Sequence, residues 1–264
     1  MRTVNLILPH SWEELSERQL LFVSSLYLQG LTRNAFLTKA FICLSGLRIL
    51  LGRYGDRENP VYRFRKKGEK AFPMSMGEIL DFCRKCEFLL EYRENFSPLP
   101  VLAGRKALNT LMYDACFGQF ISAMVYYNQF KDPEQDRHFL DKLCAVMYPP
   151  GHWNPDDIRQ EDFACLPLHV CYTVFLWFGT VMNVISRECP GLFRETSDDA
   201  EPVSLRENIH AMYNLVTEHD ITKGEFYQFN LSSCIRQQNS LTAQFVSFSL
   251  SNLANIFYPP QFLQ

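Results

Sequence analysis

The sequence predicts an all-α protein, an irregular bundle of roughly seven to nine helices. Three features predict this fold. Apolar residues recur at spacings of three and four along much of the chain, capping-box sequences precede several of these stretches, and one long stretch carries no charge. The 264 residues suit one large domain. We therefore expect a single helical domain over 1–264, with any sub-boundary near 95–104 or 149–157.

Four Ser/Thr-x-x-Glu boxes stand where apolar periodicity begins. In such a box the hydroxyl accepts a hydrogen bond from a free amide of the first helical turn, and the carboxylate accepts one from the capping residue's own amide. Each box therefore predicts a helix start. The boxes are Ser11 to Glu14, Ser75 to Glu78, Ser204 to Glu207 and Thr222 to Glu225.

Three helices are expected before the middle of the chain. The first covers 12–28 and ends at Gly30, which is free to take the left-handed cap conformation. The third covers 76–92. The second lies between them and ends before Gly52, and its apolar stripe consists of Phe36, Ala40, Cys43, Leu44, Leu47 and Leu51.

Residues 53–70 form the only strongly basic stretch of the chain. The alternation Val61-Tyr62-Arg63-Phe64-Arg65, followed by Lys67-Gly68, is compatible with a small β-hairpin near 61–72. The favoured interpretation is a solvated excursion between two helices.

The rest of the chain continues the helical pattern. One expected helix carries Phe117, Ile121, Met124 and Val125, the next carries Phe139 to Met147, and Asp132-Pro133 forms the turn between them. A proline-rich connector then leads to an uncharged helix over about 167–187. Further helices are expected at 205–218 and 223–237, with a helical pattern that continues to Phe257.

Charge, cysteine usage and hydropathy limit the class of protein. A net charge of -3 argues against a dedicated nucleic-acid binder. Nine cysteines scattered through apolar stretches indicate reduced thiols, and the N-terminus lacks a secretory signal. The uncharged stretch 163–186 is long enough to cross a bilayer, but Pro167, His169 and Asn183 favour a buried helix. We expect a cytoplasmic protein without a membrane span.

The pair Cys83-Arg84-Lys85-Cys86 is one candidate for chemistry. Positive neighbours lower a thiol pKa, as a reactive thiolate requires, but the pair lies within an expected helix and no second pair completes a zinc site. Core packing is the favoured interpretation, and a cysteine-dependent enzyme is the third functional hypothesis. No nucleotide-binding or hydrolase motif occurs. We expect no enzyme, no cofactor and no metal.

A second candidate is the loop 149–157, which brings His152, Trp153 and Asp156 together in sequence. A histidine and a carboxylate in one loop can support acid–base chemistry. The favoured interpretation is a rigid surface loop whose aspartate caps the next helix.

The basic stretch supplies a third candidate site. Rings can stack on bases while cations hold phosphates, as in single-strand-binding platforms. The residues are Arg63, Phe64, Arg65, Lys66 and Lys67. A nucleic-acid-contacting accessory factor is therefore the second functional hypothesis, with a solvated loop and an acidic protein partner as the alternatives at this site.

Several short segments resemble uncharacterised helical proteins of tailed-phage and prophage gene clusters of gut bacteria. They are Leu8 to Leu15, Phe117 to Ala123 with Tyr126-Tyr127, Leu143 to Pro149, Leu176 to Phe178 and Glu218 to Glu225. The resemblance implies a non-enzymatic virion-assembly factor, such as a tail-assembly chaperone or a minor structural component. Its partners would be proteins of the same gene cluster. This protein-interaction role is the first functional hypothesis.

Overall fold

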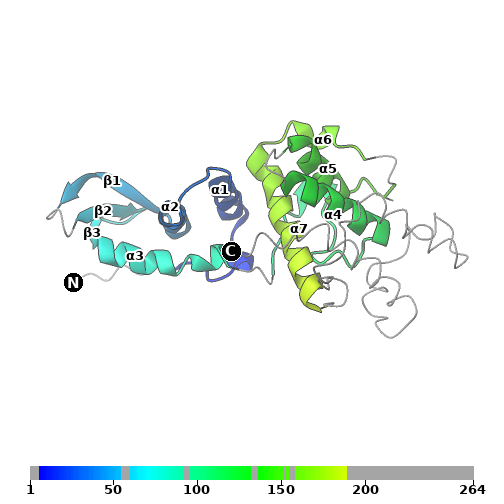
Figure 1. The fold of residues 1–264 in the computed structure, drawn as a ribbon. Coiled ribbons are helices and arrows are strands. Elements are labelled where there is room, and N and C mark those ends of the chain that lie inside the picture. Colours follow the sequence, from blue (N-terminus) through cyan, green and yellow to red (C-terminus); the bar gives the residue numbers. More distant parts are fainter. Residues whose placement is uncertain are drawn as a thin grey trace, which may run out of the picture. The chain divides into compact units, whose positions relative to one another are not determined.

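The chain divides into two compact units. The computed structural model describes residues 6–54, 60–91, 95–131, 136–151, 153–154 and 158–188. Unit 1 consists of residues 1–97 and 167–173, and unit 2 consists of residues 98–166 and 174–264 (Figure 1). The units therefore meet along the chain between Ser97 and Pro98, between Leu166 and Pro167 and between Thr173 and Val174.

Helices dominate both units, but the described residues are not purely helical. They form seven α-helices, two short 3-10 helices and two small antiparallel sheets. The helix-rich class is confirmed, and the expectation of an all-α fold is wrong.

The first helices of unit 1 begin at caps. A 3-10 turn spans Trp12–Glu14, and α1 (Glu17–Tyr27) follows it. The capping box stands at Ser16, whose side chain accepts from the amide of Gln19, whereas the expected cap at Ser11 makes no side-chain bond. Helix α2 (Arg33–Ser45) ends at Gly46, whose φ of 68° is left-handed. The expected continuation of this helix to Leu51 is wrong, because a left-handed residue ends the helical hydrogen bonding.

A three-stranded sheet occupies the place of the expected excursion. Strands β1 (Leu47–Tyr54), β2 (Val61–Lys66) and β3 (Phe72–Ser75) pair antiparallel in the order β1-β2-β3. The hairpin expected near 61–72 is confirmed and gains β1 as a third strand, so the favoured solvated excursion is wrong. The physical reason is that three strands with one apolar face bury enough surface to be stable against a helix.

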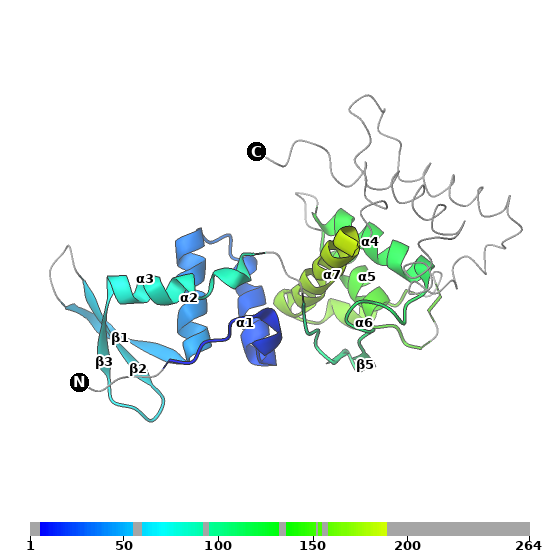
Figure 2. The ribbon, with the colours of Figure 1, turned by 90° about the horizontal axis from the view of Figure 1, so that it is seen from below.

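Helix α3 (Met76–Arg84) begins where β3 ends. Ser75 and Glu78 form both halves of the expected capping box. A 3-10 turn (Glu87–Leu89) follows α3, where the expected helix had continued to residue 92. The rings of Phe41 in α2 and Phe82 in α3 stack with centroids 5.3 Å apart. Figures 1 and 2 both show α3 running beside the sheet. The helices α2 and α3 and the three-stranded sheet therefore form the packed framework of unit 1.

Unit 2 contains the expected helix pair, α4 (Phe117–Lys131) and α5 (Arg137–Met147), followed by the short α6 (Glu161–Ala164). The long helix α7 (Leu168–Glu188) belongs to unit 1 up to Thr173 and to unit 2 from Val174 onward. Short strands β4 (Val101–Leu102) and β5 (Arg105–Lys106) form a hairpin that the sequence did not predict.

Helix α7 confirms the uncharged helix expected over 167–187. Within unit 2, its Trp177 is fully buried and donates from Nε1 to the carbonyl of Thr110 at 2.6 Å. A Cβ placed on Gly179 would lie 3.0 Å from the hydroxyl of Tyr127, so α4 and α7 approach closely at this point. The window Leu168–Ile185 is long and apolar enough to cross a membrane, yet 67% of it is buried within the structure. Core helices of soluble proteins share both properties.

Several expectations fall outside the described residues. These are the Asp132-Pro133 turn, the capping boxes at 204 and 222, the helices at 205–218 and 223–237, and the helical pattern to residue 257. They stay predictions.

Candidate functional site

The strand register gathers arginines on one face of the sheet. In an antiparallel sheet, directly opposed residues share a face, and successive residues of a strand point to opposite faces. Arg48 of β1 lies opposite Arg65 of β2, and Arg63 lies between Leu50 of β1 and Pro73 of β3. We call this surface, made of Arg48, Leu50, Arg63, Arg65 and Pro73, the arginine face. Arg48, Arg63, Arg65 and Pro73 are exposed on it, and Leu50 is half-buried.

The opposite face of the sheet is the apolar side of unit 1. Leu47, Phe64 and Met74 lie on it and are buried. Phe64 is only 1% exposed, so its ring is closed to a base. The expectation that Phe64 contacts nucleic acid is therefore wrong, because the period of two along β2 sends this ring into the core while its two arginine neighbours face outward.

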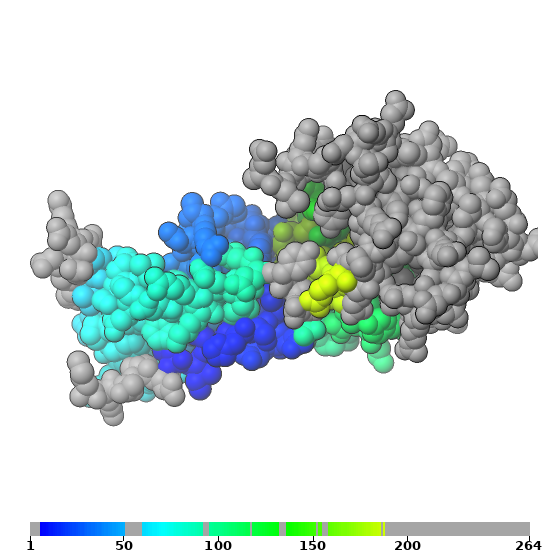
Figure 3. Space-filling view, turned by 60° about the horizontal axis from the view of Figure 1, so that its bottom comes forward, coloured from blue at the N-terminus to red at the C-terminus, as the bar shows by residue number. Residues whose placement is uncertain are grey.

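The hairpin between β2 and β3 extends the basic surface. Lys66 is half-buried at the end of β2, while Lys67 and Lys70 are exposed in the turn. The amide of Glu69 donates to the carbonyl of Lys66 at 3.0 Å, and Gly68 takes a φ of 82° that favours glycine at this position. Figure 3 shows the described surface of the first 97 residues of unit 1 in blue to cyan-green. Lys67 and Lys70 therefore project from a defined turn.

Positive charge on the sheet is concentrated. Residues 47–75 carry eight basic side chains and three acidic ones, Asp56, Glu58 and Glu69, whereas the whole chain carries a net charge of -3. Arg33–Glu87 and Arg84–Asp81 are the ion pairs that the described part of unit 1 shows, and neither includes Arg48 or Arg65. Directly opposed like charges destabilise a sheet. The opposed pair of Arg48 and Arg65 is thus an electrostatically unfavourable arrangement that an anion would relieve.

Arg48 is the residue that sequence reasoning missed. It was placed within an expected helix, whose apolar stripe ran through Leu47. A glycine directly after the last helical residue is a signal that could have located the end of the helix. Gly46 occupies that position and leaves Arg48 in an extended strand.

The cysteine pair shows no sign of nucleophilic activation. Cys83 and Cys86 are both buried and form no disulfide. Burial raises the pKa of Cys83, although a hydrogen bond with Thr38 opposes the shift. Burial, together with the nearby Cys83 thiol, raises the pKa of Cys86 to about 12. Such thiols remain protonated at neutral pH, and the thiolate is the reactive form.

The loop candidate at 149–157 is described only in part. Trp153 is half-buried, while His152 and Asp156 lie outside the described residues, so this site stays a prediction. Within the described part of the chain, no group of three or more His, Cys, Asp or Glu side chains is arranged to hold a metal ion.

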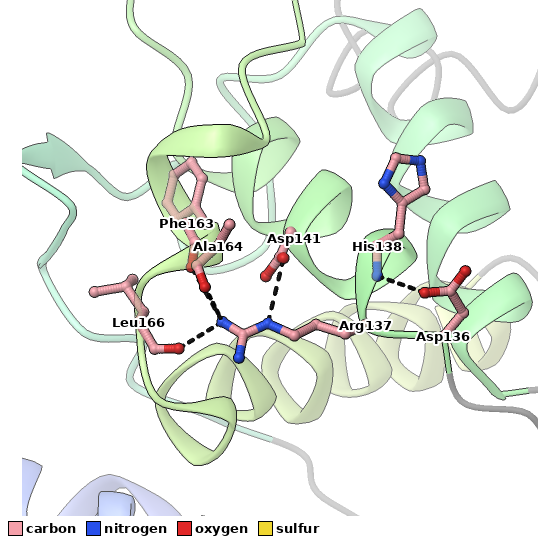
Figure 4. A network of polar contacts seen from close by, with 7 residues as sticks. All are labelled: Asp136, Arg137, His138, Asp141, Phe163, Ala164 and Leu166. Atoms are coloured by element: carbon pink, nitrogen blue, oxygen red, sulfur yellow. Dashed lines mark hydrogen bonds and ion pairs between the residues drawn. The ribbon is translucent and has the colours of Figure 1, made fainter.

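A second polar cluster, in unit 2, holds the end of α6 (Figure 4). The Arg137 Nη2 donates to the carbonyls of Ala164 at 2.8 Å and Leu166 at 2.5 Å, and its Nε lies 3.4 Å from Asp141 Oδ2. A cation stabilises the unpaired carbonyls at a helix C-terminus. Burial raises the pKa of Asp141, against the opposing effect of Arg137.

Arg105 secures the same short helix from another direction. Its guanidinium pairs with Asp162 and lies 5.4 Å from the centroid of the Phe163 ring. The hydrogen bonds and ion pairs of Arg137 and Arg105 described above are made to protein groups, while Arg105 Nη1 and Asp141 Oδ1 are buried without a hydrogen-bond partner. These contacts hold the short helix α6 in place, and the exposed arginine face is the better candidate for a binding site.

Comparisons with known proteins add no relative to this picture. No protein-family model, curated protein or solved structure matches the chain.

Proposed function

We propose that this chain is a non-catalytic binding protein, and that the arginine face of unit 1 binds the phosphate backbone of nucleic acid. The observation that carries the proposal is the exposed pair of Arg48 and Arg65, directly opposed across two strands. A protein gains nothing in folding from placing these charges together. An anionic partner would turn the repulsion into a binding contribution.

The chemistry of the side chains supports phosphate as the ligand group. A guanidinium offers a planar fork of N–H donors that matches phosphate oxygens, and it keeps its charge at any physiological pH. Lys67 and Lys70 add point charges beside the face. Such a surface binds mainly by releasing counterions from the nucleic acid, and its affinity therefore depends on salt.

Fluorescence anisotropy with a labelled oligonucleotide tests the proposal. The double variant Arg48→Gln/Arg65→Gln is expected to bind at least tenfold more weakly than the wild type at low salt. The control variant Lys106→Gln/Lys131→Gln removes the same charge from exposed positions of unit 2 and is expected to retain wild-type affinity. Equal weakening in both variants would show that net charge, and not the arginine face, determines binding.

A second candidate function is the protein-interaction role in virion assembly. Met76 and Leu80 stand one turn apart on α3 and are 37% and 44% exposed. Residues four apart share a helix face, and exposed apolar side chains of this kind suit a protein partner. The partner would come from the same gene cluster, and the complex would form in the cytoplasm.

Co-expression with the neighbouring genes tests this second function. Size-exclusion chromatography with light scattering is expected to show a co-eluting complex that the variant Leu80→Glu no longer forms. A matched change at Leu90, which is exposed in another part of unit 1, is expected to leave the complex intact. A protein that elutes alone in every case would remove this role.

A further inference from the structure

We infer that the opposed pair of Arg48 and Arg65 binds the terminal phosphate of a nucleic-acid strand, a phosphomonoester, in preference to an internal phosphodiester. This inference rests on the proposed function and specifies the group that the pair recognises. It depends on the charge and the acceptor oxygens that two neighbouring guanidinium groups require.

The strand register brings the two guanidinium groups within reach of one ligand group. Arg48 of β1 and Arg65 of β2 are directly opposed, and both side chains are exposed. Opposed residues share a face of the sheet and have Cβ atoms about 5 Å apart, so the two side chains can converge on the same anion. Among the ion pairs of the described residues, none includes either arginine. The pair therefore presents two positive charges and two forks of N–H donors to one anion.

A terminal phosphate matches the pair in charge and in acceptors. A phosphomonoester carries about two negative charges at neutral pH and has three acceptor oxygens. Each guanidinium fork can donate two parallel hydrogen bonds to such oxygens. An internal phosphodiester carries a single negative charge, and its two non-bridging oxygens are occupied by one fork. The second arginine would then keep its charge beside the first, so a phosphodiester relieves the repulsion only in part.

The turn beside the pair offers contacts for the strand that carries this phosphate. Lys67 follows Arg65 by two residues, and both Lys67 and Lys70 are exposed between β2 and β3. A lysine ammonium contacts phosphate as a point charge, which suits internal phosphates of single charge. The arginine pair would thus hold the end of the strand, while the lysines hold the backbone that follows it.

Three oligonucleotides of one sequence test the inference by fluorescence anisotropy with the full-length protein at about pH 7.5. One ends in hydroxyl groups, one carries a 5′ phosphate and one carries a 3′ phosphate, and each is labelled within the strand. The extra charge beside two cations is expected to strengthen the binding of at least one phosphorylated oligonucleotide about fourfold. Equal affinity for all three would overturn the inference and leave the proposed function in place. Absence of salt-dependent binding to all three would overturn the proposed function itself.

The second ionisation of the phosphomonoester gives an independent readout. Its pKa is about 6, whereas arginine keeps its charge throughout this range. Residues 47–75 contain no histidine, the side chain that ordinarily titrates near this pH, and their acidic residues are Asp56, Glu58 and Glu69. The preference for the phosphorylated oligonucleotide is expected to fall below about 1.5-fold at about pH 5, because the phosphate then has lost its second charge. The hydroxyl-ended oligonucleotide reports any change in the protein. A preference of the same size at both pH values would overturn the inference.

Two double variants with the same loss of charge separate the pair from the turn. Arg48→Gln/Arg65→Gln is expected to bind all three oligonucleotides with equal affinity, because the groups that recognise the phosphomonoester are gone. Lys67→Gln/Lys70→Gln is expected to weaken the binding of all three by the same factor and to retain the preference for the phosphorylated end. A preference that persists in the arginine variant, or that is lost in the lysine variant alone, would overturn the inference.

Discussion

Replacing Arg48 by glutamine is expected to make the protein more stable while weakening its binding. Arg48 and Arg65 face each other across β1 and β2 on an exposed surface, and no described carboxylate pairs with either. Glutamine is shorter than arginine but keeps a polar hydrogen-bonding group on the same Cβ–Cγ stem, and it removes the charge. The variant therefore isolates the repulsion between the two arginines from the packing of the sheet.

The size of the effect follows from the register. Cβ atoms of directly opposed residues lie about 5 Å apart, and two unit charges at about that distance repel by about 0.8 kcal/mol in water. A Debye length of about 8 Å at 0.15 M salt reduces this repulsion to about 0.4 kcal/mol. Long side chains can also splay apart, which lowers the value further. Arg48→Gln is thus expected to raise the free energy of unfolding by a few tenths of a kcal/mol.

Urea unfolding of the wild type and the variant at two salt concentrations measures this gain. It should be larger at 0.02 M salt than at 0.5 M, because screening already weakens the repulsion in the wild type at high salt. The charge reversal Arg48→Glu should raise the free energy of unfolding by more than Arg48→Gln does, since it creates an ion pair with the opposed Arg65. A loss of stability in Arg48→Gln that does not depend on salt would refute the reasoning, because it would show that the side chain contributes by packing.

Three further predictions concern the scaffold. Ser75→Ala should lower the free energy of unfolding by about 1 kcal/mol in urea titrations, because it removes the cap of α3. Gly179→Ala should lower it by about 1 kcal/mol, since crowding against the Tyr127 hydroxyl exceeds the gain in helix propensity, and Tyr127→Phe should restore stability in the double variant. Asp141→Asn should stabilise the protein at pH 7 but not near pH 3. The raised pKa of Asp141 means that the wild-type carboxyl favours folding when protonated and loses that contribution as pH rises through its folded-state pKa, which unfolding curves across this pH range would show.

Local signals in the sequence predicted many of the helices. The box at Ser75 and the uncharged run of α7 correspond to elements of the structure, because caps and helical periodicity act within a few residues. Strand β1 was missed because Leu47 and Leu51 continue a spacing that also fits a helix. A short apolar run fits both the helical period of 3.6 residues and the strand period of two. Here the left-handed Gly46 ends helix α2, and the residues after it form a strand.

The candidate site was only partly predictable for a related reason. Arg63 and Arg65 could be found from their charge alone, but the side of the sheet they share with Arg48 depends on pairing between strands. Alternation also misled the interpretation of Phe64. A ring interleaved with arginines on one strand must point away from them, so the same pattern that suggested a stacking platform excludes one at that residue.

The salt dependence of duplex binding tests the proposed function most directly. The logarithm of the association constant, plotted against the logarithm of salt concentration, falls with a slope of about -0.9 per phosphate contact. Arg48→Gln/Arg65→Gln should therefore bind more weakly and with a slope shallower by about 1.8 than the wild type. A variant with the wild-type slope and affinity would contradict the assignment of the arginine face as the binding surface.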